Sequence, residues 1–180
     1  TFKSETNMSA FPSDLTKTPR TFDSNSTYIF HSCTFRDNHA KDQNFPNFID
    51  NPHGNDHIPF GRGGGLSIFV KGVAQNNVIQ ITHCHFEDNY ALWGGGIFVE
   101  FQDKVQNNSL EINNCNFTNN NATYAGGAIR SGTIAHSNHQ QLLPNQVMNK
   151  GCLFTSNSAL LGGGVSHHGI GSLLKVENDK

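Results

Sequence analysis

The chain has 180 residues, with 12 Lys and Arg against 14 Asp and Glu and a formal net charge of −2. This balance argues against an electrostatic grip on nucleic acid or on an acidic membrane, and no run of about 18 apolar residues predicts a membrane span. Charged residues make up only 14% of the chain, which has 23 Asn and 18 Gly, so we expect a surface of amides and hydroxyls.

Residues 1–26 carry Pro12, Pro19 and scattered Ser and Thr without a clear period. This composition predicts an end segment or a partial coil. Regular alternation begins with Tyr28 and Phe30, five and three residues before Cys33. Apolar residues stand at the same offsets before Cys84 and Cys115. Alternate apolar positions predict a short strand with one buried face.

A phrase of the form CxFxxNxA, followed by glycines and an aliphatic residue, occurs four times and indicates a repeat architecture. The cysteines and phenylalanines, two apart, share one face of a second strand, and both residue types favour burial. The glycines begin a third strand. The repeated residues are Cys33, Cys84, Cys115 and Cys152; Phe35, Phe86, Phe117 and Phe154; Asn38, Asn89, Asn120 and Asn157; and Ala40, Ala91, Ala122 and Ala159.

Three short strands and three corners in about 30 residues predict an all-β fold, a parallel β-helix with coils about 4.8 Å apart. Residues 27–180 would form about four to five coils, with a partial coil at 172–180 and a bulge near 136–144. The interval from the first to the second cysteine is 51 residues against 31 for the next, which places an insertion loop at 41–60. The partial coil also predicts that the chain is a fragment of a longer protein.

The repeated residues have structural explanations. Stacked coils place each side chain above its copy, so the phenylalanines are expected to form an aromatic column. Asparagine suits a corner because it tolerates left-handed backbone angles and because stacked amides can satisfy backbone groups along the axis. Alanine fits a cramped inward site, and glycine adopts dihedral angles that other residues resist.

The FxxN motifs, together with GGAI at 126–129 and GGGI or GGGV in other coils, resemble the repeat of the chlamydial polymorphic outer membrane proteins. The resemblance covers roughly residues 27–178. It implies a right-handed parallel β-helix in a secreted or surface-displayed protein, with adhesion as the usual role. Three of the four repeats carry GGG where the family has GGA, and the motif marks the scaffold, so no binding residues carry over.

Five asparagines lie in glycosylation sequons: Asn7, Asn25, Asn107, Asn116 and Asn121. A chain this rich in Asn, Ser and Thr also produces sequons by chance. Together with the low charge and the repeat scaffold, however, they favour an extracellular or cell-surface glycoprotein.

An even number of cysteines in an extracellular chain suggests disulfides. All four nevertheless occupy one ladder position, where parallel Cβ vectors would leave the Cβ atoms about 4.8 Å apart, beyond the preferred separation. Buried free thiols that act as small apolar fillers are therefore the favoured interpretation, and disulfides between vertical neighbours are the alternative.

Two groups of residues are candidates for a catalytic or metal site. Asp37 and Asp88, with Glu87 beside them, could form an acid or calcium-binding pair of the kind used by polysaccharide lyases and hydrolases on this fold. Polar residues at an exposed corner explain them better. His83 and His85, and the pair His167 and His168, lack a convergent set of zinc ligands. The sequence therefore predicts no catalytic residue, cofactor or metal.

The favoured function is an extracellular structural or adhesive module that displays loops and flat sheets to a protein or glycan. Phe45, Phe48 and Phe60 in the insertion loop are candidate contacts. Two alternatives remain open: a subunit that stacks end to end into an extracellular filament, and a carbohydrate-active enzyme acting on acidic polysaccharides.

Overall fold

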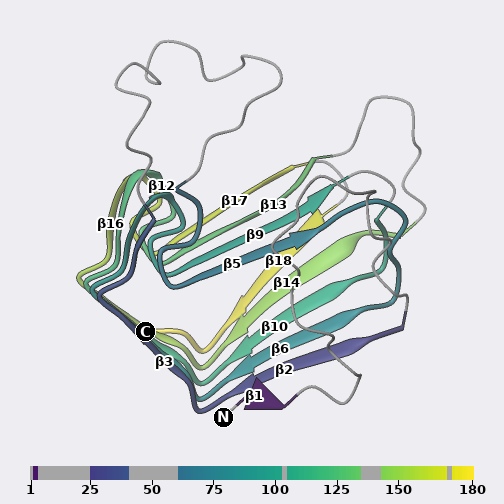
Figure 1. Cartoon of the computed structure of the whole chain (residues 1–180), viewed down its shortest axis with the longest axis horizontal. Helices are drawn as coiled ribbons and strands as arrows, with labels where there is room; N and C mark the ends of the chain where they lie inside the picture. Colours follow the sequence, from purple (N-terminus) through teal and green to yellow (C-terminus); the bar gives the residue numbers. More distant parts are fainter. Residues whose placement is uncertain (1, 4–24, 41–60, 103–104, 135–142, 170–171) are drawn as a thin grey trace, which may run out of the picture.

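A computed structural model describes residues 2–3, 25–40, 61–102, 105–134, 143–169 and 172–180. These ranges hold only strands, turns and bends, and the strands stack coil upon coil in register (Figure 1). The predicted all-β parallel β-helix is therefore confirmed. Within the same ranges, no helix is long and apolar enough to cross a membrane.

The strands pair into four sheets, here called A to D. All pairings are parallel except that of β1 with β2. Sheet A contains β1 (Phe2–Lys3), β2 (Thr27–His31), β6 (Val78–Thr82), β10 (Ser109–Asn113), β14 (Asn145–Lys150) and β18 (Ser172–Glu177). Sheet B contains β3 (Thr34–Arg36), β7 (His85–Glu87), β11 (Asn116–Thr118) and β15 (Leu153–Thr155). Sheet C contains β4 (His39–Ala40), β8 (Tyr90–Trp93), β12 (Asn121–Ala125) and β16 (Ser158–Leu161), and sheet D contains β5 (Leu66–Val70), β9 (Ile97–Gln102), β13 (Ile129–Ile134) and β17 (Val165–Gly169).

Sheets A, B and D correspond to the three strands expected in each repeat, and the short strands of sheet C come in addition. Sheet C carries the alanine ladder, in which Ala91 pairs in register with Ala40 and Ala122. Ala91 and Ala122 are buried. A strand with one small inward residue has no alternating apolar pattern, so sequence periodicity does not mark it.

The core is a column of phenylalanine rings flanked by aliphatic residues of sheets A and D. Successive rings of Phe35, Phe86, Phe117 and Phe154 are stacked nearly parallel, with centroids 4.7, 4.9 and 5.1 Å apart. Phe86 and Phe117 are fully buried. The column therefore fills the coil interior at the spacing that the strands impose.

The corner between sheets B and C differs from the expectation in one respect. The left-handed residue is not the repeated asparagine but the one before it, with φ of 55° at Asp37 and 54° at Asp88 and Asn119. Asn89 and Asn120 instead point inward and are fully buried. The turn is made by the short polar residue in front, which leaves the asparagine free to hydrogen-bond along the solenoid axis.

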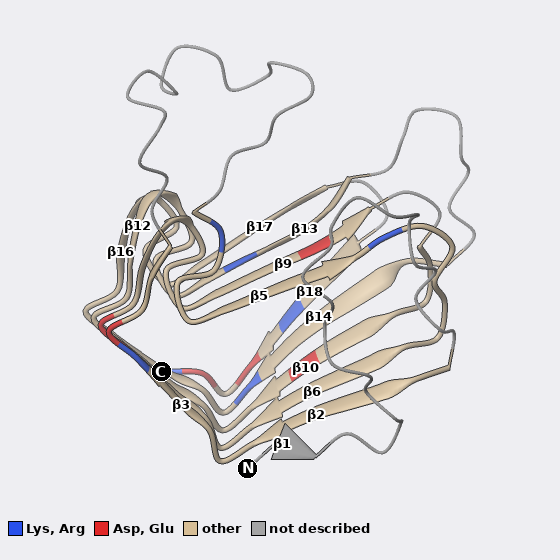
Figure 2. Cartoon of the chain, in the orientation of Figure 1, with Lys and Arg blue, Asp and Glu red and all other residues tan. Residues whose placement is uncertain are grey.

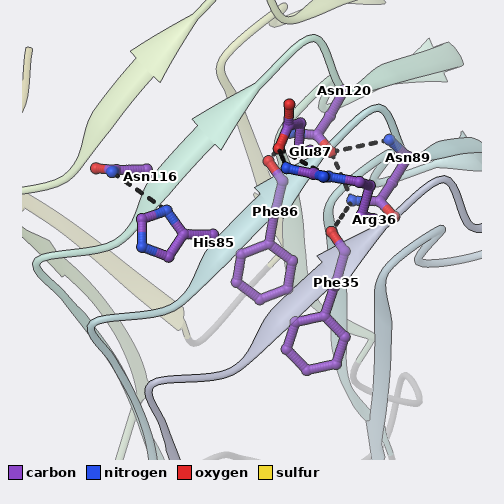
Figure 3. A network of polar contacts seen from close by, with 8 residues as sticks. All are labelled: Phe35, Arg36, His85, Phe86, Glu87, Asn89, Asn116 and Asn120. Atoms are coloured by element: carbon purple, nitrogen blue, oxygen red, sulfur yellow. Dashed lines mark hydrogen bonds and ion pairs between the residues drawn. The ribbon is translucent and has the colours of Figure 1, made fainter.

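The buried asparagines form an amide ladder. Asn89 donates to Asn120 Oδ1 from its backbone nitrogen at 3.2 Å and from Nδ2 at 2.9 Å, and its Nδ2 also donates to the Phe35 carbonyl at 2.9 Å. Part of this network appears in Figure 3. Every coil thereby satisfies backbone groups of the coil beside it, as predicted for stacked amides.

A second amide ladder precedes sheet A and was not predicted. Asn77 donates to Asn108 Oδ1 from its backbone nitrogen at 3.0 Å and from Nδ2 at 2.9 Å, and Asn108 repeats both bonds with Asn145. All three side chains are buried. The pattern lies outside the CxFxxNxA phrase, which explains why the phrase alone did not reveal it.

The cysteine ladder behaves in a similar way at the corner between sheets A and B. The Cys84 backbone nitrogen donates to Cys115 Sγ at 3.4 Å, and the Cys115 thiol donates to the carbonyl of Asn113 at 3.3 Å. All four cysteines lie within the described ranges, and no disulfide joins them. The buried thiols of Cys84 and Cys115 therefore accept and donate hydrogen bonds as well as filling apolar space.

We predict that these thiols react only after unfolding. Cys84, Cys115 and Cys152 are buried, which keeps a reagent away from them. Contacts with the thiols of Cys152 and Cys84 raise the pKa of Cys115, whereas the contact with Cys115 lowers the pKa of Cys84 to about 6 and also lowers that of Cys152, so access rather than ionisation prevents the reaction. A thiol reagent should count four cysteines in denaturant and at most one, the half-buried Cys33, in the folded protein. Fewer than four reactive thiols in denaturant would show that disulfides form instead.

Candidate functional site

The predicted acid pair lies at an exposed corner. Asp37 and Asp88 occupy its left-handed turn positions, and Glu87 is held by Arg36 of the preceding coil, whose Nε donates to Glu87 Oε2 at 3.0 Å (Figure 3). Figure 2 shows how few charged segments the described strands carry. The carboxylate nearest the pair is thus engaged in an ion pair.

The histidines do not converge either. His83 occupies a left-handed turn position, and the ring of His85 lies 3.4 Å from Asn116 Nδ2 on sheet B. His167 Nδ1 contacts Ser131 Oγ at 2.9 Å, and its Nε2 contacts Ser172 Oγ at 3.0 Å. Among the residues that the structure describes, no three His, Cys, Asp or Glu side chains gather into a metal site.

The sequon asparagines differ in place from the ladder asparagines. Asn25, Asn107 and Asn121 are exposed and Asn116 is half-buried, whereas the ladder members of the inner coils are buried. Asn7 lies outside the described residues, as do the insertion loop at 41–60 and its three phenylalanines.

A cluster of aromatic and charged side chains lies on the outer face of sheet D, which we call the D face. In β9, Ile97, Val99 and Phe101 belong to the core, so the alternate residues Phe98 and Glu100 point to the other side. The register places Arg130 beside Phe98, and the column of Glu100 contains Phe69 on one side and Gly132 followed by His168 on the other.

Arg62 spans the first half of the D face. It precedes the glycines that lead into β5, and its guanidinium lies 4.8 Å from the ring centroid of Phe98 and 5.3 Å from that of Phe69. Its Nη1 pairs with Glu100 Oε1 at 3.3 Å, and only 13% of the Arg62 side chain and 5% of that of Glu100 are exposed. Gln102 also donates to Glu100. In this half of the D face, the Arg62 guanidinium therefore forms an ion pair with Glu100 and cation–π contacts with both phenylalanine rings.

Arg130 organises the second half. Its guanidinium lies 5.3 Å from the ring centroid of Trp93, and the Trp93 ring lies 4.4 Å from that of Tyr124. Nη1 donates to Ser166 Oγ at 3.3 Å, and Nη2 lies 2.6 Å from His168 Nδ1. Gly132 makes the last contact possible, because a Cβ there would stand 2.4 Å from His168 Nδ1.

Trp93 ends β8 of sheet C, yet it contacts a residue of sheet D. Figure 1 shows why: the chain rises along β8, β12 and β16 and folds back before it enters sheet D. The returning segments and the D face therefore meet at an inside corner, which we call the Arg130 corner and define by Arg130, Trp93, Tyr124 and His168. Arg130 is only 7% exposed, while Trp93 and Tyr124 are half-buried and His168 is exposed.

The charges in this face do not balance. Burial lowers the pKa of Arg62 and of Arg130, but guanidinium remains protonated at any physiological pH. Arg62 pairs directly with Glu100. The charge of Glu100 also opposes the lowering of the Arg130 pKa, but no carboxylate of the described residues lies within ion-pair distance of Arg130. The face can thus offer a buried cation beside two aromatic rings.

Histidine protonation should weaken the Arg130 corner. Burial, and then the charge of Arg130, lower the pKa of His168, while Glu100 opposes the shift; burial, His168 and Arg130 lower that of His167. The folded state therefore binds protons less readily than the unfolded state, so stability falls as the pH drops through about 6.5. His168→Gln keeps an acceptor for Arg130 and should reduce this loss of melting temperature between pH 8 and 5. His85→Gln on sheet B is the control, and identical pH profiles for all three proteins would contradict the prediction.

No family model, no curated protein and no solved structure matches the chain. The D face was also not predicted from the sequence. Arg62, Trp93, Glu100 and Arg130 do not recur from coil to coil, so the repeat gives no hint of them. The available signals were the single tryptophan of the chain and the arginine that directly follows the GGAI motif.

Proposed function

We propose that the chain is an extracellular structural and adhesive β-helix module that binds a glycan or protein partner through the D face. The observation that carries this proposal is the Arg130 corner, where a buried guanidinium without a carboxylate partner in the described chain lies against two half-buried aromatic rings. Aromatic side chains and arginine are the residues that dominate the energetics of binding surfaces.

The scaffold suits such a role because it holds the face in one geometry. The amide ladders before sheet A and at the corner between sheets B and C, together with the stacked rings, fix the coils relative to one another. A partner then binds without a large cost of ordering the contact residues. The exposed sequon asparagines support an extracellular location, since the oligosaccharide transferred to such a site needs open space.

The chemistry of the D face favours binding over catalysis. Glycoside hydrolysis ordinarily uses two carboxylates about 5–10 Å apart, with one of them free to donate or accept a proton. Among the described residues, Glu100 is the carboxylate of this face, and it accepts hydrogen bonds from Arg62 and Gln102. A carboxylate held in this way is a counter-ion rather than a general base.

A filament of stacked copies has mixed support. The last coil exposes apolar side chains, among them Leu160 at 73% and Leu173 at 54%. At the other end, however, β1 pairs antiparallel with the outer edge of β2. That edge of sheet A is therefore occupied, and a parallel strand from another copy would have to displace β1.

Binding by matched surface variants tests the proposal. The chain would be immobilised and exposed to a panel of neutral oligosaccharides, acidic oligosaccharides and extracellular-matrix proteins. A D-face variant, Arg62→Gln with Tyr124→Ala, should lose at least about 10-fold in affinity, which corresponds to about 1.4 kcal/mol. The control, His85→Ala with Asn116→Ala, changes the outer face of sheet B and should bind like the wild type. Absence of any binding, or equal loss in both variants, would contradict the proposal.

A further inference from the structure

We propose that the Arg130 corner binds a sugar that carries a carboxylate, so that the partner of the D face is an acidic glycan. This inference rests on the proposed binding function and narrows it to one class of ligand. It assigns the carboxylate to Arg130 and the ring of the sugar to Trp93 and Tyr124.

The two arginines of the D face can be compared, because one has a carboxylate partner and the other has none in direct contact within the described chain. On one half, a guanidinium lies over an aromatic ring, 4.8 Å from the centroid of Phe98, and pairs with the carboxylate of Glu100. On the other half, Arg130 lies 5.3 Å from the centroid of Trp93. Its partners there are a serine hydroxyl, a backbone carbonyl and an imidazole, all of them neutral. The second half therefore also places a guanidinium against an aromatic ring, but without a carboxylate of the described residues in direct contact.

A carboxylate from a ligand would complete this second half. Nε of Arg130 has no hydrogen-bond partner among the described residues, so its N–H is left for a ligand. Arginine binds carboxylates through parallel N–H groups, and such charge-assisted bonds are about twice as strong as neutral ones. The low pKa of His168 leaves its ring neutral near pH 7, so it accepts from Arg130 and adds no charge of its own.

The aromatic rings of Trp93 and Tyr124 would contact the sugar ring of the ligand. Trp93 and Tyr124 are half-buried and tilted at 52° to each other, so parts of both rings remain open beside the guanidinium. Aromatic side chains pair an apolar face with a polar edge, which matches a pyranose with its C–H face and its hydroxyl groups. One cation beside two rings suits a single acidic group on a sugar.

A more highly charged partner fits less well. A polyanion such as nucleic acid is held by many phosphate contacts, which need several Lys or Arg side chains along a track. The D face contains Arg62, already paired with Glu100, Lys71 5.0 Å from the ring of Phe69, and Arg130. A protein partner would in turn need a larger apolar contact area than two half-buried rings.

The single tryptophan makes a direct test possible, because Trp93 is the only one in the chain and stands in the corner. Trigalacturonate and a sialylated lactose would be titrated against Trp93 fluorescence, with galactotriose and lactose as neutral counterparts and calorimetry as a second readout. We expect at least one acidic sugar to bind at least about 10-fold more tightly than its neutral counterpart. Arg130→Gln should abolish this preference, Arg130→Lys should restore part of it, and Arg36→Gln at the corner of sheets B and C should leave it intact.

A modified ligand tests the role of the carboxylate on the unmodified protein, so this test does not depend on whether a variant folds. Methyl-esterified trigalacturonate keeps the sugar rings but removes the charges, so it should bind the unmodified protein like galactotriose. Equal binding of the acidic, esterified and neutral sugars would overturn the inference but leave the proposed function intact if the D-face variant weakens them all. Binding of neither acidic sugar would overturn the inference. If the rest of the panel of glycans and matrix proteins also failed to bind, the proposed function would fall as well.

Discussion

Replacing Asn120 with alanine should destabilise the protein by about 4 kcal/mol, because the change leaves buried backbone groups without partners. Asn120 Oδ1 accepts from the backbone nitrogen of Asn89 at 3.2 Å, and its Nδ2 donates to the carbonyl of Phe86 at 2.9 Å. Both groups lie in a region where Asn120 itself is fully buried. Each group left unsatisfied costs about 1–3 kcal/mol, and the bond to Asn157 is lost as well.

The next residue offers a matched control. Asn121 is exposed at the start of β12, so Asn121→Ala should change stability by less than about 0.5 kcal/mol. Urea unfolding followed by Trp93 fluorescence compares the two, since Trp93 lies in β8, the strand next to β12. Similar midpoints for Asn120→Ala and Asn121→Ala would show that the amide ladder contributes little.

The scaffold could be predicted from the sequence because its determinants repeat. Phenylalanine, asparagine and alanine at fixed offsets identify a stacked column even when the coil lengths differ. The inward aromatic column follows from the strong preference of phenylalanine for burial. Among Asp88, Asn89 and their copies, however, both residue types tolerate left-handed angles, so the sequence alone could not assign the turn to the first and the ladder to the second.

The D face could not be predicted because its contacts join residues that occur once. Arg62 and Glu100 are 38 residues apart, and Arg130 and His168 are also separated by 38 residues. Such pairs become visible only when the register of sheet D is known. The spacing of such pairs along the sequence depends on the lengths of the segments that project from the stack between strands. These lengths vary from coil to coil while the repeated residues stay the same. A site made of unrepeated residues therefore remains hidden in the pattern that reveals the fold.

The glycine runs, unlike the D face, repeat in the coils because backbone geometry restricts their positions. The first glycine of each run is left-handed, with φ of 64° at Gly94 and 69° at Gly126. The third position is less restrictive, because Ala128 occupies it in one coil and bonds there in register with Gly96 and Gly164. This explains how GGA and GGG coils coexist in one chain. The middle glycine is confined by a different neighbour from the first: a Cβ at Gly126 would meet the carbonyl oxygen of Ile129 in its own coil at 2.3 Å, whereas a Cβ at Gly127 would meet backbone of the next coil.

Gly127→Ala should accordingly be strongly destabilising, with a loss of about 4 kcal/mol or more. A Cβ at this middle position would stand 2.2 Å from the carbonyl oxygen of Gly163 and 2.5 Å from that of Ser158. Both obstacles are backbone atoms of the next coil, so the two coils would have to move apart and lose hydrogen bonds in sheets C and D. Gly164→Ala is the control, because a Cβ there meets only the ring of Phe154 at 4.0 Å. Urea midpoints should fall steeply for the first variant and little for the second, and a stable Gly127→Ala protein would mean that the coils are not stacked as closely as the structure places them.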